Sequence, residues 1–250
     1  MERKKILINK ANPILFGKNA YDQLDNLIIQ KSYSKILIFS DFETRKYCLP
    51  VLESKIKSII ELTETHNYSI NSGETNKNLE SAKIIWQFLI EKGFKRNSLI
   101  INLGGGMITD LGGFIASAYM RGVDFVNIPT SLLGMVDASI GGKTGINIAE
   151  GKNLIGAIYQ PSGVFIDPKL LDSLPKDEVV SGLGEVIKYG AIRDRKFLDN
   201  VIIFSPKAEI FLITLPFSPP DRNFLDNVSF FPSDRKFLDN VIIFPADIFP

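Results

Sequence analysis

The chain has 250 residues, of which 45% are hydrophobic and 23% charged, and its formal net charge is +1. These values are ordinary for a globular protein of one large or two modest domains, and they give no support to a nucleic-acid or membrane partner. The single cysteine, Cys48, excludes an intrachain disulfide framework, and no apolar stretch approaches the length of a membrane span. The composition therefore predicts a soluble protein of the cytoplasm.

Strand-like and helix-like segments alternate in the first half of the chain. Residues 35–40, 98–103 and 124–128 are predicted as buried strands, and residues 78–92 as a helix whose apolar residues, Leu79 to Leu89, recur at intervals of three and four. Trp86 belongs to this apolar face, so core packing is its expected role. The alternation predicts an α/β fold with a Rossmann-like, mostly parallel sheet, which binds ligands at the carboxyl ends of its strands.

A glycine turn, Gly104-Gly-Gly-Met-Ile-Thr-Asp110, follows the second predicted strand, and a helix-compatible run follows the turn. Consecutive glycines let the backbone approach a phosphate, and a helix N-terminus offers free N–H groups. The turn is not the G-x-G-x-x-G fingerprint, because Thr109 stands at its last position. A tight structural turn is the alternative. Asp41 closes the first strand, where a carboxylate can bind ribose hydroxyls, although a helix cap is the favoured interpretation.

Two lysines follow glycines downstream, Lys143 and Lys152, and lysines on such turns suit phosphate or carboxylate groups. The triplet at 142–144 resembles the end of a P-loop, but the first glycine of that motif is missing and Asp137 would repel a nucleotide phosphate. We therefore discount a nucleotide triphosphatase.

Pro175 followed by acidic residues predicts a helix start, with Ser181, Glu185 and Lys188 on one face of the helix. Beyond Ile192, residues 194–204 recur letter for letter at 234–244, with a degraded copy at 221–231. The irregular spacing excludes a solenoid, and more than half of the prolines fall after position 200. We predict a loosely packed tail, and leave open whether a truncation, a frameshift or an assembly error produced it.

Seven motifs stand in the order and spacing of 3-dehydroquinate synthase. They are the glycine turn ending in Asp110, Tyr119-Met-Arg-Gly122, Pro129-Thr-Ser-Leu-Leu133, Val136-Asp-Ala-Ser-Ile-Gly-Gly-Lys-Thr144, Gly151-Lys-Asn153, Tyr159-Gln-Pro161 and Gly182-Leu-Gly-Glu-Val-Ile-Lys-Tyr-Gly190. On these motifs the chain resembles that family of sugar phosphate cyclases up to about Ile192. Iron-type alcohol dehydrogenases share the architecture but not the motif set, and other cyclases, such as 2-deoxy-scyllo-inosose synthase, are the nearest rivals.

The resemblance implies a domain plan and a set of site residues. Residues 1–173 would form an NAD-binding domain, 174–193 the first helix of a truncated α-helical metal and substrate domain, and 194–250 a poorly ordered tail. The cofactor residues would be Asp41, Glu74, Lys77, Gly105, Gly106, Asp110, Thr130, Ser131 and Ser173. The substrate residues would be Asp137, Lys143, Lys152, Asn153 and Lys188, with Arg121 reaching the substrate phosphate of a neighbouring subunit in a homodimer.

The resemblance also implies an activity. The family converts 3-deoxy-D-arabino-heptulosonate 7-phosphate to 3-dehydroquinate and phosphate, a lyase reaction of the shikimate pathway towards chorismate and the aromatic amino acids. NAD is used and regenerated, and zinc or cobalt is held by three ligands, of which Glu185 would be one. A metal lowers the pKa of a bound hydroxyl, which assists hydride transfer to NAD.

The metal site is where the sequence departs from the family. The family supplies two histidines from its second domain, whereas this chain has one histidine, His66, which lies upstream of the glycine turn and is expected on the surface or in a loop. Three hypotheses remain: a damaged copy of a dehydroquinate synthase, a non-catalytic NAD-binding remnant, and another cyclase or a polyol dehydrogenase of the superfamily. We predict that the chain as given is inactive.

Overall fold

The computed structural model describes residues 5–7, 12–17, 20–193, 206–208 and 229–230. These residues divide into two compact units, one reaching Leu183 and one beginning at Gly184. Most of the tail predicted for 194–250 lies outside the described residues. The domain plan stays a prediction.

The first unit is built on a seven-stranded sheet with the strand order β1-β2-β9-β6-β5-β3-β4. Only β1 and β2 pair antiparallel, and all the other neighbours are parallel. The strands span Lys5–Leu7 (β1), Pro13–Phe16 (β2), Lys35–Asp41 (β3), Glu64–Ile70 (β4), Leu99–Gly104 (β5), Asp124–Pro129 (β6) and Val164–Ile166 (β9). The predicted mostly parallel sheet is confirmed, and each of the three predicted strands agrees with the structure to within one residue at either end.

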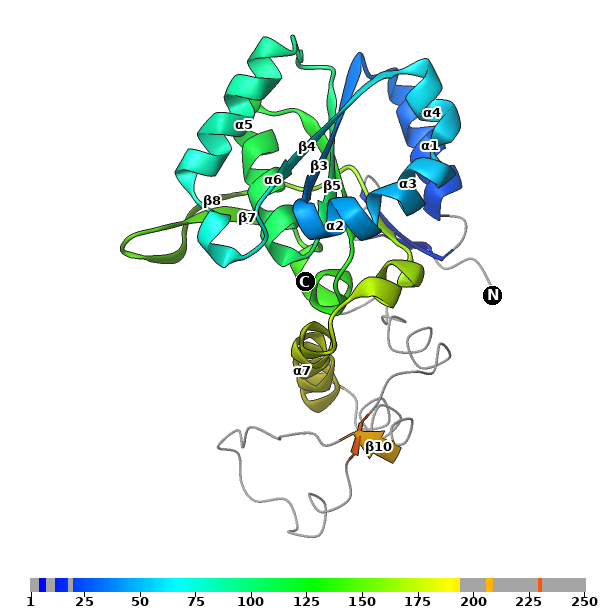
Figure 1. The fold of residues 1–250 in the computed structure, drawn as a ribbon, viewed down its shortest axis with the longest axis vertical. Helices are drawn as coiled ribbons and strands as arrows, with labels where there is room; N and C mark the ends of the chain where they lie inside the picture. The colour runs from blue at the N-terminus through cyan, green and yellow to red at the C-terminus, as the bar shows by residue number, and fades with distance from the viewer. Residues whose placement is uncertain (1–4, 8–11, 18–19, 194–205, 209–228, 231–250) are drawn as a thin grey trace. The chain divides into compact units, whose positions relative to one another are not determined.

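Helices cover both faces of this sheet, with α5 and α6 on one side and α1, α3 and α4 on the other (Figure 1). The α-helices span Ala20–Lys31 (α1), Phe42–Tyr47 (α2), Leu49–Lys55 (α3), Lys57–Leu62 (α4), Leu79–Glu91 (α5), Gly106–Ala118 (α6) and Lys176–Arg193 (α7). Shorter helical turns span Glu74–Asn76 (η1), Tyr119–Arg121 (η2), Gly134–Ala138 (η3, a π-helical turn) and Pro168–Ser173 (η4). No described helix is both long and apolar enough to span a bilayer.

The core between the sheet and α5 and α6 follows from the side-chain periods of the elements. Leu37 and Phe39 alternate on β3, whereas Ala82, Ile85 and Leu89 recur along α5, and all five are buried. Trp86 packs against this cluster, as predicted, and its indole nitrogen donates to the carbonyl of Ile115. Leu79 lies at the first turn of α5 and is 53% exposed, so it is not part of the buried face.

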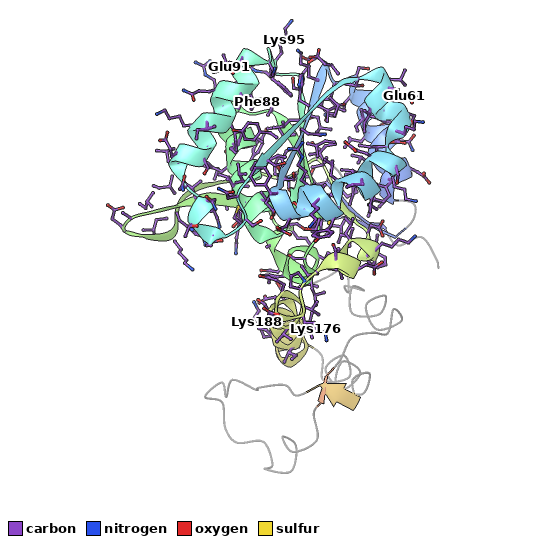
Figure 2. All side chains as sticks on the ribbon, viewed as in Figure 1. Glu61, Phe88, Glu91, Lys95, Lys176 and Lys188 are labelled. Atoms are coloured by element: carbon purple, nitrogen blue, oxygen red, sulfur yellow. The ribbon has the colours of Figure 1, made fainter. Side chains whose placement is uncertain are left out.

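The outer faces of the unit are charged. Figure 2 shows Glu61, Glu91 and Lys95 at its periphery, where all three side chains are exposed. Phe88 lies nearer the sheet and packs against the core cluster. The helices of this unit are therefore apolar towards the sheet and polar towards solvent, as expected for an α/β layer.

Helix α6 approaches its neighbours unusually closely on two sides. A Cβ on Gly112 would stand 1.9 Å from Oδ1 of Asn102 in β5, and a Cβ on Gly113 would stand 2.4 Å from Cγ2 of Thr144. Thr144 belongs to β7 (Lys143–Ile148), which pairs antiparallel with β8 (Gly151–Ile158) in a separate hairpin. The two glycines therefore let α6 lie between the main sheet and this hairpin.

The second unit contains the end of α7 and two short strands, β10 (Pro206–Ala208) and β11 (Ser229–Phe230), which pair in parallel. Within α7, the first turn carries Asp177 and Glu178 next to the positive end of the helix dipole. The helix start predicted at Pro175 is thus confirmed, with Lys176 as the first helical residue.

We predict that Gly112→Ala destabilises the protein by about 1–3 kcal/mol, because the new methyl group overlaps a buried asparagine that cannot leave the sheet. The urea midpoint of unfolding measures the loss. Gly184→Ala is the matched control, since its Cβ meets no described atom within 4 Å and helix propensity alone would stabilise by up to about 1 kcal/mol. Equal midpoints for the two variants would contradict the close approach of α6.

Candidate functional site

The candidate site lies where the central parallel strands end. Strand β3 ends at Asp41, β5 at Gly104 and β6 at Pro129, and these three strands are neighbours in the order β6-β5-β3. From β3 the chain passes through α2, α3 and α4 to β4 on one side, whereas β5 and β6 lie on the other side. The strand order therefore reverses between β3 and β5, and ligands of open α/β sheets bind at such a switch point.

The glycine turn and the segment after β6 meet at this edge. The amide of Thr130 donates to the carbonyl of Gly104 at 3.1 Å, and Ser131 Oγ lies 3.2 Å from the point where a Cβ on Gly105 would stand. Ser131 Oγ also accepts from the amide of Gly134, at the start of η3. These contacts hold the glycine turn in place on one side, and helix α6 begins directly after it.

The π-helical turn η3 packs on the same glycines. A Cβ on Gly106 would lie 3.2 Å from that of Ala138, the residue after Asp137. The buried amide of Asn127 holds the end of this turn, because Nδ2 donates to the carbonyl of Ser139 at 2.9 Å. Asp137 therefore lies in η3, which is hydrogen-bonded to β6 and packs next to the start of α6.

A buried ammonium group joins residues from three separate elements. Lys77 is only 3% exposed, and its Nζ donates to Oδ2 of Asp110 at 2.5 Å and to Oδ1 of Asn153 at 2.6 Å. Glu74 Oε1 lies 3.7 Å from the same nitrogen. A buried charge requires such partners, since an unpaired ammonium in this position would be strongly destabilising. Four predicted site residues are therefore in one polar cluster.

The pKa of Asp110 reflects two opposing influences. Burial raises the pKa of this carboxyl group, and the charges of Glu74 and Asp137 act in the same direction. The hydrogen bond and charge of Lys77 act in the opposite direction but do not cancel the effect of burial. Asp110 is thus a carboxyl group whose charge depends on one lysine, next to the first turn of a helix.

The hairpin contributes two asparagines to the cluster. Asn153 in β8 has a φ of +56°, a left-handed conformation that asparagine tolerates better than most residues. Asn147 in β7 donates through Nδ2 to Glu74 Oε1 at 2.8 Å and accepts at Oδ1 from the amide of Asn153. Asn147 was not among the predicted site residues. Its partner Glu74 is 73 residues away, so no local pattern could have indicated the contact.

Asp41 caps helix α2. Its Oδ1 accepts from the amide of Thr44 at 2.8 Å, and Thr44 Oγ1 accepts from the amide of Asp41. The favoured interpretation as a helix cap is confirmed, and a role in binding ribose stays a prediction. Ser173 lies beside Cys48 at the other end of α2, with its Oγ 3.8 Å from the cysteine sulfur.

The basic residues predicted to face substrate are spread out within the first unit. Lys143 opens β7 and Lys152 lies near the hairpin turn, so the two are about 13 Å apart along the hairpin. Both side chains are exposed. Arg121 is exposed beyond the C-terminus of α6, which itself ends about 12 Å along the helix from Asp110. None of the three joins the Lys77 cluster.

The predicted metal ligand lies in the second unit, where Glu185 forms an ion pair with Lys188 one turn further along α7. Among the described residues, no three His, Cys, Asp or Glu side chains gather in a way that could hold a metal ion. His66 lies in strand β4 rather than in a loop, with its side chain 23% exposed and its Nε2 2.8 Å from Glu64 Oε1. The described residues therefore do not fit a three-ligand zinc site.

Residues 67–181 match the family model described as "3-dehydroquinate synthase N-terminal". This range includes the glycine turn, η3 and the hairpin. The chain is also 41% identical over 217 residues to a 3-dehydroquinate synthase of Prochlorococcus marinus (strain MIT 9312), a match that covers 84% of this chain. Over these residues, the chain is similar to the 3-dehydroquinate synthase family.

A second relative, the 3-dehydroquinate synthase of Alkaliphilus metalliredigens (strain QYMF), is 46% identical over 167 residues, or 67% of this chain. The two matches cover 59% and 46% of those relatives' own lengths. The chain thus spans only about half the length of the curated relatives it matches.

Two solved structures of other enzymes share the fold. A 2-deoxy-scyllo-inosose synthase complexed with carbaglucose-6-phosphate, NAD+ and Co2+ has a TM-score of 0.70 at 22% identity, covering 96% of this chain and 60% of that one. The 2-epi-5-epi-valiolone synthase of Streptomyces hygroscopicus subsp. jinggangensis 5008, with NAD+ and Zn2+ bound, has a TM-score of 0.63 at 30% identity, covering 75% and 51%.

We predict that Lys77→Met raises the pKa of Asp110 further, because the substitution removes both influences that lower it and leaves burial in place. Titration of the Asp110 carboxyl carbon by NMR measures the change. Lys143→Met is the control, since that exposed lysine is not among the groups acting on Asp110. A pKa that stays the same or falls in Lys77→Met would show that the ion pair is not formed in solution.

Proposed function

We propose that this chain carries the cofactor-binding half of a 3-dehydroquinate synthase. The corresponding reaction is the NAD-dependent conversion of 3-deoxy-D-arabino-heptulosonate 7-phosphate to 3-dehydroquinate and phosphate. The observation that carries the proposal is the cluster of Lys77, Asp110 and Asn153. It unites the glycine turn ending in Asp110, the Gly151-Lys-Asn153 motif and the segment after β4 that carries Lys77.

The residues at this edge fit a dinucleotide. Gly105 and Gly106 keep side chains away from the strand–helix turn, where a Cβ would press on Ser131 and Ala138. The first turn of α6 offers unpaired amides and the positive end of its dipole to a pyrophosphate. Glu74, Lys77 and Asp110 would hold the adjoining ribose and phosphate groups, and bound NAD would supply reversible hydride acceptance.

The hairpin side suits a phosphorylated sugar acid. Lys143 and Lys152 are exposed cations on flexible stems, which can turn towards phosphate or carboxylate groups. Asn153, the residue after Lys152, accepts a hydrogen bond from Lys77, while Asp137 stands next to the glycine turn. We propose that these residues orient the substrate beside the cofactor, and that Arg121 serves the substrate phosphate of a second copy in a homodimer.

A non-catalytic NAD-binding protein is the second candidate. It is favoured by the absence of a three-ligand metal group among the described residues and by the single histidine of the sequence. Glu185 alone would bind zinc weakly, because one carboxylate leaves most of the coordination shell to water. Both candidates require NAD binding, and only the first requires turnover.

We predict that the purified chain binds NAD weakly and releases no phosphate from the heptulosonate substrate, even with added zinc. Lys77→Met should weaken NAD binding by about tenfold or more, because each 1.4 kcal/mol of lost interaction is a factor of ten. Isothermal titration calorimetry measures the affinity, and a coupled phosphate assay measures turnover.

Lys57→Met is the matched control for calorimetry, since Lys57 lies in α4 with its side chain 79% exposed. Its affinity for NAD should equal that of the unmodified chain. Phosphate release at an enzyme-like rate would refute the predicted inactivity. Absence of any heat with NAD would instead refute the proposed cofactor site. NAD-linked oxidation of a polyol without phosphate release would point to a dehydrogenase of the superfamily.

A further inference from the structure

Asn147 contacts three residues of the candidate site at once. Its amide donates to the carbonyl of Lys77 at 2.8 Å, and its side-chain Nδ2 donates to Oε1 of Glu74 at 2.8 Å. Its Oδ1 accepts from the amide of Asn153 at 2.9 Å. The residue thus joins the segment after β4 to strand β8 of the hairpin, two segments far apart in the sequence.

Both side-chain contacts act on residues that also lie close to the Lys77 ammonium. The Glu74 side chain is 43% exposed, and its Oε1 lies 3.7 Å from Nζ of Lys77. The hydrogen bond from Asn147 Nδ2, at 2.8 Å, is therefore the shorter of its two polar contacts. Asn153 adopts a left-handed conformation, and its own Oδ1 reaches the Lys77 ammonium at 2.6 Å. A hydrogen bond to its backbone amide therefore fixes the direction in which its side chain points.

We infer that Asn147 is a positioning residue that orients Glu74 and Asn153 together about the Lys77 ammonium. The inference rests on the proposed function, in which Glu74 and Lys77 hold the dinucleotide and Asn153 faces the substrate. Asn147 touches neither ligand in this scheme. Its side chain donates a hydrogen bond to Glu74 and accepts one from Asn153. These two bonds together set the position of the cofactor residue relative to the substrate residue.

Asparagine, alanine and aspartate at position 147 differ in which of the two side-chain hydrogen bonds they can form. Alanine removes both contacts. Aspartate keeps an acceptor for the Asn153 amide but loses the donor to Glu74 and places a like charge beside that carboxylate. The inference therefore predicts different patterns for Asn147→Ala and Asn147→Asp, whereas simple loss of folding would affect both measurements in parallel.

The experiment combines NAD affinity with amide hydrogen exchange of Asn153, measured by NMR on the full chain. Both variants should bind NAD about tenfold more weakly, since each loses a hydrogen bond to a charged group. Exchange at Asn153 should accelerate about tenfold in Asn147→Ala and stay near the original rate in Asn147→Asp. In a Glu74→Ala background, Asn147→Ala should change NAD affinity by less than about twofold, because its effect passes through Glu74.

Asn67→Ala is the matched control, because its Nδ2 also donates to a glutamate, Glu53 Oε1 at 3.1 Å, in β4 outside the cluster. This variant should retain NAD affinity and Asn153 exchange. Additive losses in the double mutant, or an unchanged Asn153 exchange rate in Asn147→Ala, would overturn the inference. If the unmodified chain binds no NAD, the proposed function fails on its own and the exchange rates alone decide the role of Asn147.

Discussion

The close approach of helix α6 to β5 on one side and to β7 on the other is the constraint on which the site depends. Gly112 and Gly113 make it possible, because a methyl group at either position would overlap Asn102 or Thr144. Asp110 lies on the same helix, less than one turn before these glycines. The packing that seats α6 between the sheet and the hairpin therefore also brings Asp110 within reach of Lys77 and Asn153.

Electrostatics at the carboxyl edge follows from this packing. Burial of Lys77 would be unfavourable without Asp110 beside it, and burial of Asp110 raises its pKa even with Lys77 beside it. The charge of Asp110 therefore depends on Lys77. A pair of this kind is poorly suited to adding stability, but it holds polar groups in fixed directions, which is what binding of a dinucleotide requires.

The residues proposed for the cofactor and the residue proposed for a metal lie in different units of this chain. The residues proposed for the dinucleotide lie in the first unit, whereas Glu185 lies in the second unit. Relatives of the family are longer, and the matches cover about half of their length. Binding of NAD and catalytic turnover therefore depend on different residues in the proposed scheme. The described cluster around Lys77 concerns NAD binding.

The sequence by itself determined the local features: the parallel strands, the glycine turn before α6, the cap at Asp41 and the start of α7. Each depends on residues within a few positions of one another, so side-chain period, glycine and capping chemistry are enough to predict them. Only the tertiary structure decided which polar groups meet. The contacts of Lys77 with Asp110 and Asn153 span 33 and 76 residues, and that of Asn147 with Glu74 spans 73. Lys143 and Lys152, similar in sequence context, lie about 13 Å apart along the hairpin because of the register in which β7 and β8 pair.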